Sequence, residues 1–351
     1  MSNYKYSFKN DYSELAHPTI IEAFIRSSIE QNEGYGLDVH SEQAREAIQS
    51  ILQNHNVDIH FVSGGTQANL IVLSSILRPH EAVIACESGH IFVHETGAIE
   101  ATGHKICTVK SENGKLTADH VHQVCAQHTD EHMVKPKVVF ISQSTELGTV
   151  YTKQELADLR NICQELGLYL YMDGARLGAG LASSACDVEY TDLTQLLDVF
   201  YIGGTKNGAL FGEAIVIVHS DLKADFRYHM KQKGGMLAKG SSMGIQFAEL
   251  FISRRSIATT LYEQLALHNN KQAMRLAHGI KTLGFDFMTE PTTNQLFPIL
   301  PKQIAHKLSI TYGFYIWEDL GENVIIRLVT SWAITEEVID GFLEDLHASQ
   351  I

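Results

Sequence analysis

The sequence predicts an α/β protein with a largely parallel, doubly wound sheet and a smaller C-terminal α/β domain. Two observations predict this class. Short apolar runs recur along the first two thirds of the chain, and most lack the alternation of a half-exposed strand, as expected for strands covered on both faces. Helical segments lie between these runs, and strands that alternate with helices build parallel sheets. We place the domain boundary near residue 250, which gives domains 1–250 and 251–351.

Each element of the large domain has a local signal. Residues 57–61 alternate apolar and polar side chains, which predicts a short strand, and a turn with two glycines then leads into an apolar helix. Thr152 and Glu155 form a capping box that opens a second helix, and Gly167 closes it. The other predicted strands are 138–141, 168–172, 199–202 and 214–218.

The sequence changes character after residue 218. A stretch rich in Lys, Gly and Ser, 231–242, precedes a long helical region from about 243 to 283. The last part of the chain has the pattern of short strands and a final helix after Thr335. One face of that helix is apolar, with Val338, Ile339, Phe342 and Leu346.

Composition limits the possible partners and the compartment. The 351 residues include 27 Lys and Arg against 41 Asp and Glu, and the net charge of −14 argues against nucleic acid and anionic membranes. No apolar run approaches the ~18–20 residues of a membrane span, and the first residues lack the apolar core of a secretory signal. Five scattered cysteines without a C-x-x-C pair indicate a reduced, cytoplasmic protein.

Polar residues follow two of the predicted strands. Gly64, Gly65 and Thr66 stand between a strand and a helix N-terminus, where free backbone N–H groups can hold a phosphate, although most such turns are only turns. Asp173 comes directly after strand 168–172, where a lone aspartate is most often a helix N-cap. Each signal is weak when taken alone.

Two basic residues occupy unusual places. Thr205 and Lys206 lie between glycines, shortly after one buried strand and before the next, where lysine is uncommon unless it lies at a loop tip. Arg327 lies inside an apolar strand, 324–330, and therefore needs an anionic partner. A buried ion pair and a bound ligand are equal alternatives for that partner.

Together these four clusters suit one chemistry. Ligands of open α/β sheets bind beyond the carboxyl ends of the strands. Pyridoxal 5'-phosphate needs a lysine for a Schiff base, a carboxylate for its pyridine nitrogen and an N–H-rich cup for its phosphate. An amino-acid substrate adds an arginine for its carboxylate. Lys206, Asp173, the glycine turn and either Arg327 or Arg176 meet these needs.

Several segments resemble the threonine aldolases of the beta-eliminating lyase group, which are fold type I pyridoxal-phosphate enzymes. They are 61–69 (FVSGGTQAN), 172–177 (MDGARL), 204–208 (GTKNG) and 327–332 (RLVTSW). The resemblance spans nearly the whole chain in the right order. The sequence at 204–208, together with STELG at 144–148, looks most like the phenylserine aldolase branch.

The resemblance implies a role for each matching residue. Lys206 forms the Schiff base, Asp173 pairs with the pyridine nitrogen and His90 stacks on the cofactor ring. The implied cofactor-binding residues are Gly64, Gly65, Thr66, His90, Asp173, Arg176, Thr205 and Lys206. The implied residues for the substrate carboxylate are Asn10, Arg176 and Arg327. Asn10 stands where many members have a serine, and Glu146 where many have a second histidine.

The implied reaction cleaves a β-hydroxy-α-amino acid of the threonine, allo-threonine or phenylserine type to glycine and an aldehyde. Lys206, His90 and Glu146 are the expected catalytic residues, and the base is His90, Glu146 or a water between them. Another pyridoxal-phosphate reaction, β-elimination or transamination, and a cofactor-binding protein without turnover are the alternatives.

The resemblance also implies a homodimer or homotetramer with shared active sites, in which Lys231, Lys233 or Lys239 reaches a neighbouring subunit's phosphate. We expect no metal site, since His90 and His94 have helical ligand spacing but no evident third ligand. No G-x-G-x-x-G follows a predicted strand, which disfavours a nicotinamide site.

Overall fold

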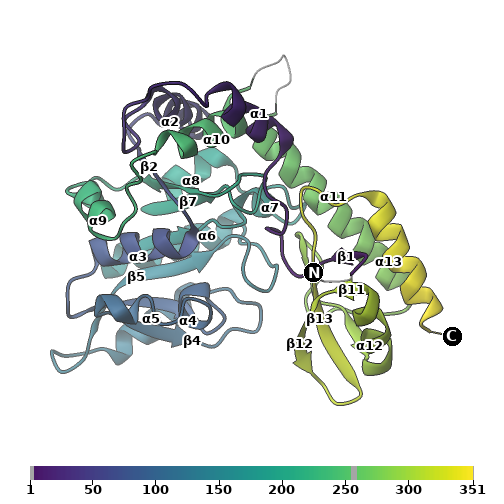
Figure 1. Cartoon of the computed structure of the whole chain (residues 1–351). Coiled ribbons are helices and arrows are strands. Elements are labelled where there is room, and N and C mark those ends of the chain that lie inside the picture. Colours follow the sequence, from purple (N-terminus) through teal and green to yellow (C-terminus); the bar gives the residue numbers. More distant parts are fainter. Residues whose placement is uncertain (1–3, 254–258, 351) are drawn as a thin grey trace.

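A seven-stranded sheet forms the centre of the protein in a computed structural model that describes residues 4–253 and 259–350 (Figure 1). The strand order is β2-β8-β7-β6-β5-β3-β4. The strands are β2 (Asp58–Val62), β3 (Glu81–Cys86), β4 (Lys105–Val109), β5 (Lys135–Ser142), β6 (Tyr169–Asp173), β7 (Val199–Gly203) and β8 (Glu213–Ile217). Strand β8 runs antiparallel to both of its neighbours and the other pairs are parallel, which confirms the predicted sheet.

Helices cover both faces of this sheet, as a doubly wound fold requires. Along β5, Val139 and Ile141 join one apolar cluster, whereas Val138 and Phe140 join the cluster on the opposite face. The first face carries α1 (Pro18–Arg26), α2 (Val39–Leu52), α5 (Ala118–Gln127), α6 (Lys153–Leu166), α7 (Leu177–Leu181), α8 (Tyr190–Leu196) and α10 (Ser241–Phe251). The second carries α3 (Gly65–Ile76), α4 (His90–Val93) and α9 (Phe226–Gln232).

The local signals place most elements correctly. All five predicted strands of the large domain exist, and β5 is longer than expected because it extends to Lys135 and Ser142. In α6 the Thr152 and Glu155 side chains each bond the other's backbone N–H, and Gly167 ends the helix in the left-handed conformation. Strands β3 and β4 are additional to those predicted.

The helical region predicted from about 243 to 283 contains two helices among the described residues. Helix α10 ends at Phe251, because Ile252 adopts an extended conformation. Thr260 then caps a second helix, α11 (Leu261–Thr282), through a new capping box with Glu263. Part of the expected helical region, residues 254–258, lies outside the described residues.

A smaller C-terminal layer lies beside the large sheet, and α11 runs from one to the other (Figure 1). Its elements are β9 (Gln295–Leu296), β10 (Ile299–Pro301), α12 (Lys302–Thr311), β11 (Tyr312–Gly313), β12 (Tyr315–Asp319), β13 (Asn323–Val329) and α13 (Glu336–Ala348). The N-terminal strand β1 (Tyr6–Ser7) pairs with β11, and Phe8 joins the apolar cluster of this layer. The domain boundary at residue 250 stays a prediction.

Two single-turn 3-10 helices, Glu100–Thr102 and Ser220–Leu222, complete the secondary structure of the described residues. None of the helices in residues 4–253 and 259–350 has the length and apolar character needed to cross a membrane.

Candidate active site

Lys206 follows β7 at the carboxyl edge of the sheet. The Gly203–Gly204 backbone packs closely there, because a Cβ on Gly203 would lie 2.4 Å from the Ala175 carbonyl oxygen. Burial and the neighbouring Arg176 lower the pKa of Lys206, while the Asp11 and Asp173 carboxylates oppose that shift. The structure therefore favours the neutral, nucleophilic form of this amine more than water does.

Glu213 stabilises the Lys206 loop from the start of β8. Its carboxylate accepts hydrogen bonds from the Thr205 hydroxyl (2.8 Å) and the Gly204 N–H (2.9 Å). Burial raises the pKa of Glu213 from 4.5 to about 7. Thr205 also accepts a bond from the Gly212 N–H at 3.0 Å, so its hydroxyl links the ends of β7 and β8.

Asp173 ends β6 and is buried within a ring of donors. Its Oδ1 accepts from the Tyr201 hydroxyl (2.5 Å) and the Ala175 N–H (3.0 Å), and its Oδ2 accepts from Asn69 Nδ2 (3.1 Å). These bonds fix the orientation of the carboxylate. A fixed, buried carboxylate suits a protonated pyridine nitrogen.

The turn after β2 presents the N-terminus of α3. Gly64 is the N-cap and makes no side-chain capping bond, so the N–H groups of the first turn remain available to an anion. A Cβ on Gly65 would lie 2.8 Å from the Tyr201 hydroxyl, whereas one on Gly64 would meet nothing within 4 Å. Thr66 lies exposed in the same turn.

His90 and Glu146 are in contact, as expected for residues of one site. The His90 backbone N–H donates to Glu146 Oε1 at 3.0 Å, and the same oxygen accepts from the Ser142 hydroxyl at 2.8 Å. Burial and the nearby Asp173 charge raise the pKa of Glu146. His90 Nδ1 bonds Glu95 Oε1 at 2.8 Å, and the Glu95 side chain is fully buried.

Arg176 forms an ion pair with Asp11, a partner that the sequence pattern did not reveal. Its Nε and Nη2 donate to the two oxygens of Asp11 at 2.7 and 3.0 Å, and Asn294 Nδ2 donates to Asp11 Oδ2 at 2.9 Å. Burial acts to raise the pKa of Asp11, but Arg176 and Lys206 outweigh it and hold that pKa below its usual value.

Arg327 has no carboxylate within ion-pair distance among residues 4–253 and 259–350, so the buried ion pair considered for it does not occur there. Its Nη2 donates to Gln295 Oε1 at 2.7 Å, its guanidinium lies 5.8 Å from the centre of the Trp317 ring, and its buried Nε has no hydrogen-bond partner within that part of the chain. Burial and Arg176 lower the pKa of Arg327 to about 10. An arginine in this state can accept an anionic ligand.

Asn10 lies one residue before Asp11 and closes a turn. Its Oδ1 accepts from the Tyr12 N–H (3.0 Å) and the Ser13 hydroxyl (2.9 Å). The amide oxygen is thus engaged locally, and the amide nitrogen is the group that suits a carboxylate ligand.

The structure brings the predicted residues together at one edge of the sheet. These groups lie near enough for their charges to shift one another's pKa: Arg176 and Asp173 act on Lys206, Asp173 acts on Glu146, and Arg176 acts on Arg327. The residues that sequence reasoning missed are Asp11, Asn69, Glu95, Glu213, Asn294 and Gln295. Asn69 stands within the quoted motif 61–69 and Glu95 directly follows His94, whereas Asp11 lies in a polar stretch without a distinguishing pattern.

The donor set fits pyridoxal 5'-phosphate. A lysine amine with a lowered pKa, a fixed buried carboxylate and an uncapped helix N-terminus come from the ends of β7, β6 and β2. The unpartnered Nε of Arg327 leaves a place for the carboxylate of an amino acid.

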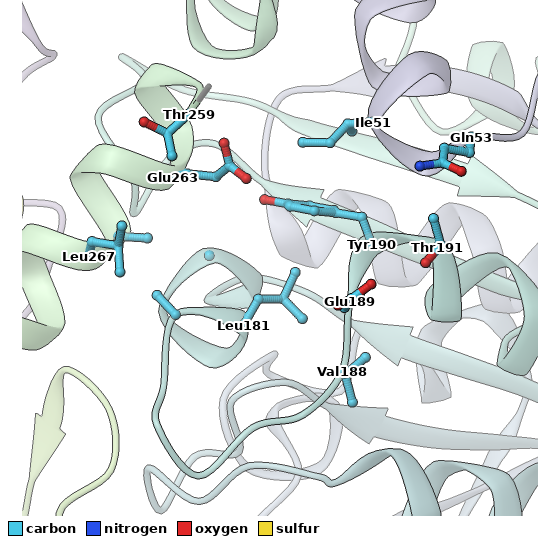
Figure 2. Close-up of a pocket in the computed structure, with 13 residues that line it drawn as sticks. Ile51, Gln53, Leu181, Val188, Glu189, Tyr190, Thr191, Thr259, Glu263 and Leu267 are labelled. Atoms are coloured by element: carbon cyan, nitrogen blue, oxygen red, sulfur yellow. The ribbon is translucent and has the colours of Figure 1, made fainter. Parts of the chain in front are cut away.

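A separate cavity of about 400 Å³ lies between the ends of α2, α7, α8 and α11 (Figure 2). The Tyr190 ring spans it and its hydroxyl end points toward Glu263 (Figure 2). Glu263 and Glu189 are both engaged in capping boxes, and none of the predicted site residues lines the cavity. This cavity is therefore not the site that the motifs build.

His90 and His94 have ring centres 5.5 Å apart. Within the described parts of the chain, no group of three His, Cys, Asp or Glu side chains is placed to hold a metal ion.

Comparisons with known proteins agree with this geometry. The sequence pattern of the family described as "Beta-eliminating lyase" matches residues 16–302. The chain is 34% identical over 351 residues to a low specificity L-threonine aldolase of Pseudomonas sp., covering 99% of both chains. It is 33% identical to the enzyme of the same name from Pseudomonas aeruginosa, covering 99% of this chain and 98% of the relative.

Solved structures give the same result. A threonine aldolase of Leishmania major superimposes with a TM-score of 0.95 and 44% identity, covering 98% of this chain and 99% of the other. A Thermus thermophilus aspartate aminotransferase, 14% identical with a TM-score of 0.72, shares the fold alone, with 99% of this chain and 92% of that chain covered. These matches confirm the predicted resemblance and the fold type I architecture, and the chain belongs to the beta-eliminating lyase family, among its threonine aldolases.

Proposed function

We propose that this site cleaves the Cα–Cβ bond of a β-hydroxy-α-amino acid and releases glycine and an aldehyde. The chain is a pyridoxal-phosphate-dependent lyase of the threonine aldolase family. One observation carries the assignment of the site: Lys206, with a lowered pKa, lies among Asp173, Asp11 and Arg176 at the carboxyl edge of the sheet.

Different residues of the chain bind the cofactor and the substrate. When bound, the cofactor accepts the electron pair left at Cα as the Cα–Cβ bond breaks. Lys206 supplies the amine that attaches the cofactor, and Asp173 stabilises a proton on the pyridine nitrogen. The N–H groups at the start of α3 hold the phosphate, and Arg327 binds the substrate carboxylate.

We assign Glu146 as the base that takes the β-hydroxyl proton, with His90 positioned beside it. The raised pKa of Glu146 supports this role, because a carboxylate with a raised pKa is a stronger base near neutral pH. Glu146→Gln and His90→Phe should each slow turnover of hydroxy amino acids by ~100-fold or more, since that is the usual contribution of a positioned base. Unchanged turnover in both variants would remove these residues from the mechanism.

The decisive experiment measures aldehyde release by the purified, cofactor-loaded protein. The substrates are L-threonine, L-allo-threonine, their D-isomers and phenylserine, and Lys206→Ala is the control. We expect aldehyde and glycine in equal amounts, lost in the control, and the best substrate decides whether the chain belongs to the phenylserine aldolase branch. Ammonia with a keto acid would instead identify β-elimination or transamination.

We also propose that the protein forms a homodimer or homotetramer with shared active sites. Seven of the sixteen exposed large apolar side chains in the described residues lie between Tyr12 and Val39, and Ile29 is 92% exposed. This segment begins one residue after Asp11, so an interface here adjoins the active site. Lys231, from the basic stretch expected to reach a partner's phosphate, lies 4.4 Å from the centre of the Tyr35 ring.

Light scattering coupled to size-exclusion chromatography tests this assembly. Ile29→Asp places a charge in the apolar segment and should shift the mass toward the monomer, with loss of activity at low protein concentration. Ile310→Asp, at another exposed apolar site, on α12, is the control. A monomeric wild-type protein with full activity contradicts the proposal.

A cytoplasmic location is the last part of the proposal. The five cysteines are free, and a reduced state of all five is typical of the cytoplasm. Fractionation of cells that express the full chain tests it, and recovery outside the cytoplasm contradicts it.

A further inference from the structure

Two buried polar residues, Glu95 and Asn69, connect the histidine expected to stack on the cofactor ring with the aspartate expected to pair with its pyridine nitrogen. His90 Nδ1 bonds Glu95 Oε1 at 2.8 Å, and Asn69 Nδ2 donates to the same Glu95 oxygen at 2.7 Å. Asn69 Nδ2 also donates to Asp173 Oδ2 at 3.1 Å. A continuous hydrogen-bonded chain therefore runs from His90 through Glu95 and Asn69 to Asp173.

The orientation of the Asn69 amide follows from its partners. Two carboxylates lie on one side of it, and each requires an N–H donor, so the two hydrogens of Nδ2 serve both. The Tyr171 hydroxyl donates to Asn69 Oδ1 at 2.7 Å and occupies the other side. A flipped amide would place its oxygen against two carboxylates, so the position of Nδ2 is fixed.

The position of Glu95 is energetically unfavourable, which a residue with a packing role alone would not require. Its side chain is fully buried, and its Oε2 has no hydrogen-bond partner within residues 4–253 and 259–350. The next residue, Thr96, adopts φ 52°, a left-handed conformation that β-branched residues rarely take. Such strain is concentrated at functional sites, where a backbone must present one side chain in one place.

We propose that Glu95 and Asn69 are positioning residues that couple His90 to Asp173. Glu95 fixes the His90 imidazole through its Nδ1, so Nε2 is the ring nitrogen that remains to contact groups other than Glu95. Asn69 holds the carboxyl groups of Glu95 and Asp173 in one fixed arrangement. This inference rests on the proposed function, because it takes His90 and Asp173 as the residues against the cofactor.

The test measures the dissociation constant of pyridoxal 5'-phosphate and the visible absorption of the loaded protein. Asn69→Leu removes the shared donor at similar volume, and we expect the dissociation constant to rise about tenfold with a shift of the absorption band. Asn270→Leu is the matched control, since Asn270 is a buried amide that donates to the Ala179 carbonyl. Circular dichroism of each cofactor-free variant confirms folding.

A double-mutant cycle tests whether Glu95 acts through His90. Glu95→Gln should raise the dissociation constant about fivefold when His90 is present and less than twofold in the His90→Phe background, which has no Nδ1. Glu81→Gln is the control, because Glu81 is a buried carboxylate that accepts from the Arg78 N–H outside this chain of bonds. The cycle remains informative if Asn69→Leu fails to fold.

The outcomes separate this inference from the proposed function. Equal effects of Glu95→Gln in both backgrounds, or cofactor binding by Asn69→Leu equal to that of Asn270→Leu, overturn the coupling. A wild-type protein that binds the cofactor but releases no aldehyde overturns the proposed reaction and leaves the binding test valid.

Discussion

The two arginines of the site differ in what their side chains contact. Asp11 occupies Arg176 with two hydrogen bonds, whereas Arg327 bonds only the neutral Gln295 and keeps a buried Nε without a partner in the described residues. We therefore expect Arg327→Lys to raise KM for the amino acid at least tenfold, since lysine cannot bind a carboxylate through two parallel bonds. Steady-state kinetics with the best substrate measure this, and cofactor affinity should stay close to that of the wild type.

Arg176→Lys is the matched control for that prediction. It loses one of the two hydrogen bonds of a buried ion pair that joins the N-terminal segment to the large sheet, so it should lower the melting temperature and raise KM less than Arg327→Lys does. If Arg176→Lys raises KM without loss of stability and Arg327→Lys leaves KM unchanged, the roles of the two arginines are exchanged.

The raised pKa of Glu213 predicts that the stability of the cofactor-free protein depends on pH. Burial raises the pKa of its carboxyl from 4.5 to about 7, so the folded cofactor-free protein holds this proton more tightly than the unfolded chain. Below about pH 4.5 this carboxyl has no effect on the free energy of unfolding, because it is protonated in both the folded and the unfolded state. As pH rises to about 7, its ionisation lowers that free energy increasingly. The full cost is at most roughly 3 kcal/mol.

Glu213→Gln removes that cost and keeps an acceptor for the Gly204 N–H. The melting temperature of the cofactor-free variant should exceed that of the wild type by more at pH 8 than at pH 5. Glu81→Gln, at a buried carboxyl that lies away from the Lys206 loop, serves as the control. A difference that is constant between the two pH values would show that Glu213 does not titrate in this range.

Sequence reasoning identified the charged candidate site residues that stand out in short motifs and missed most of the residues that contact them. Lys206 and Asp173 stand out because a charged side chain is uncommon directly after a buried strand and beside glycines. Asp11 lies in a polar N-terminal stretch, and Glu213 looks like the ordinary start of a strand. Their importance arises from burial and from partners distant in sequence, which a linear pattern does not contain.

At the scale of elements, α3 and β7 meet too closely for any side chain at Gly65. A Cβ there would lie 2.8 Å from the Tyr201 hydroxyl, and the next atom, Tyr201 Cζ, is 3.6 Å away. Gly65→Ala should therefore cost about 1–3 kcal/mol of unfolding free energy, and less than ~1 kcal/mol in a Tyr201→Phe background that lacks the hydroxyl.

Chemical denaturation of the four cofactor-free proteins measures this coupling. Gly64→Ala is the control, because a Cβ there meets nothing within 4 Å. Additive losses in Gly65→Ala and Tyr201→Phe would mean that the hydroxyl is not what excludes a side chain from position 65.

Elements with a strong local signal were the predictable ones. The α6 helix begins and ends at residues whose side chains or conformation define a boundary, and the prediction of both ends is confirmed. The break between α10 and α11 has no glycine or proline to mark it, since residues 251–260 read FISRRSIATT. Apolar runs such as β3 are fully buried, so their pattern does not separate a strand from a buried helix.

At the scale of the whole molecule, the first residues of the chain complete the last part of the fold. The Phe8 N–H donates to the Gly313 carbonyl at 2.7 Å, and the Phe8 carbonyl accepts from the Val329 N–H at 2.9 Å. Its ring packs against Phe342 of α13, with centres 5.2 Å apart. A two-residue strand such as β1 has no sequence signal, because its stability comes entirely from partners more than 300 residues away.

This connection predicts that Phe8 supports the substrate pocket as well as the fold. Phe8 is fully buried, and Phe8→Ala should cost about 3–5 kcal/mol of unfolding free energy. Asp11, three residues later, holds Arg176, so loosening of this segment should raise KM for the amino acid while cofactor affinity changes little, because α3 and Asp173 belong to the large sheet.

Phe342→Ala makes a cavity in the same cluster from the other end of the chain, where no site residue follows, and it separates the two effects. We expect the two variants to lose similar unfolding free energy in urea, whereas only Phe8→Ala raises KM. The KM difference should arise because the N-terminal segment carries Asp11 into the site, while α13 packs on the C-terminal layer and carries none of the candidate site residues. An equal rise of KM in Phe342→Ala would show instead that the pocket responds to the general stability of that layer.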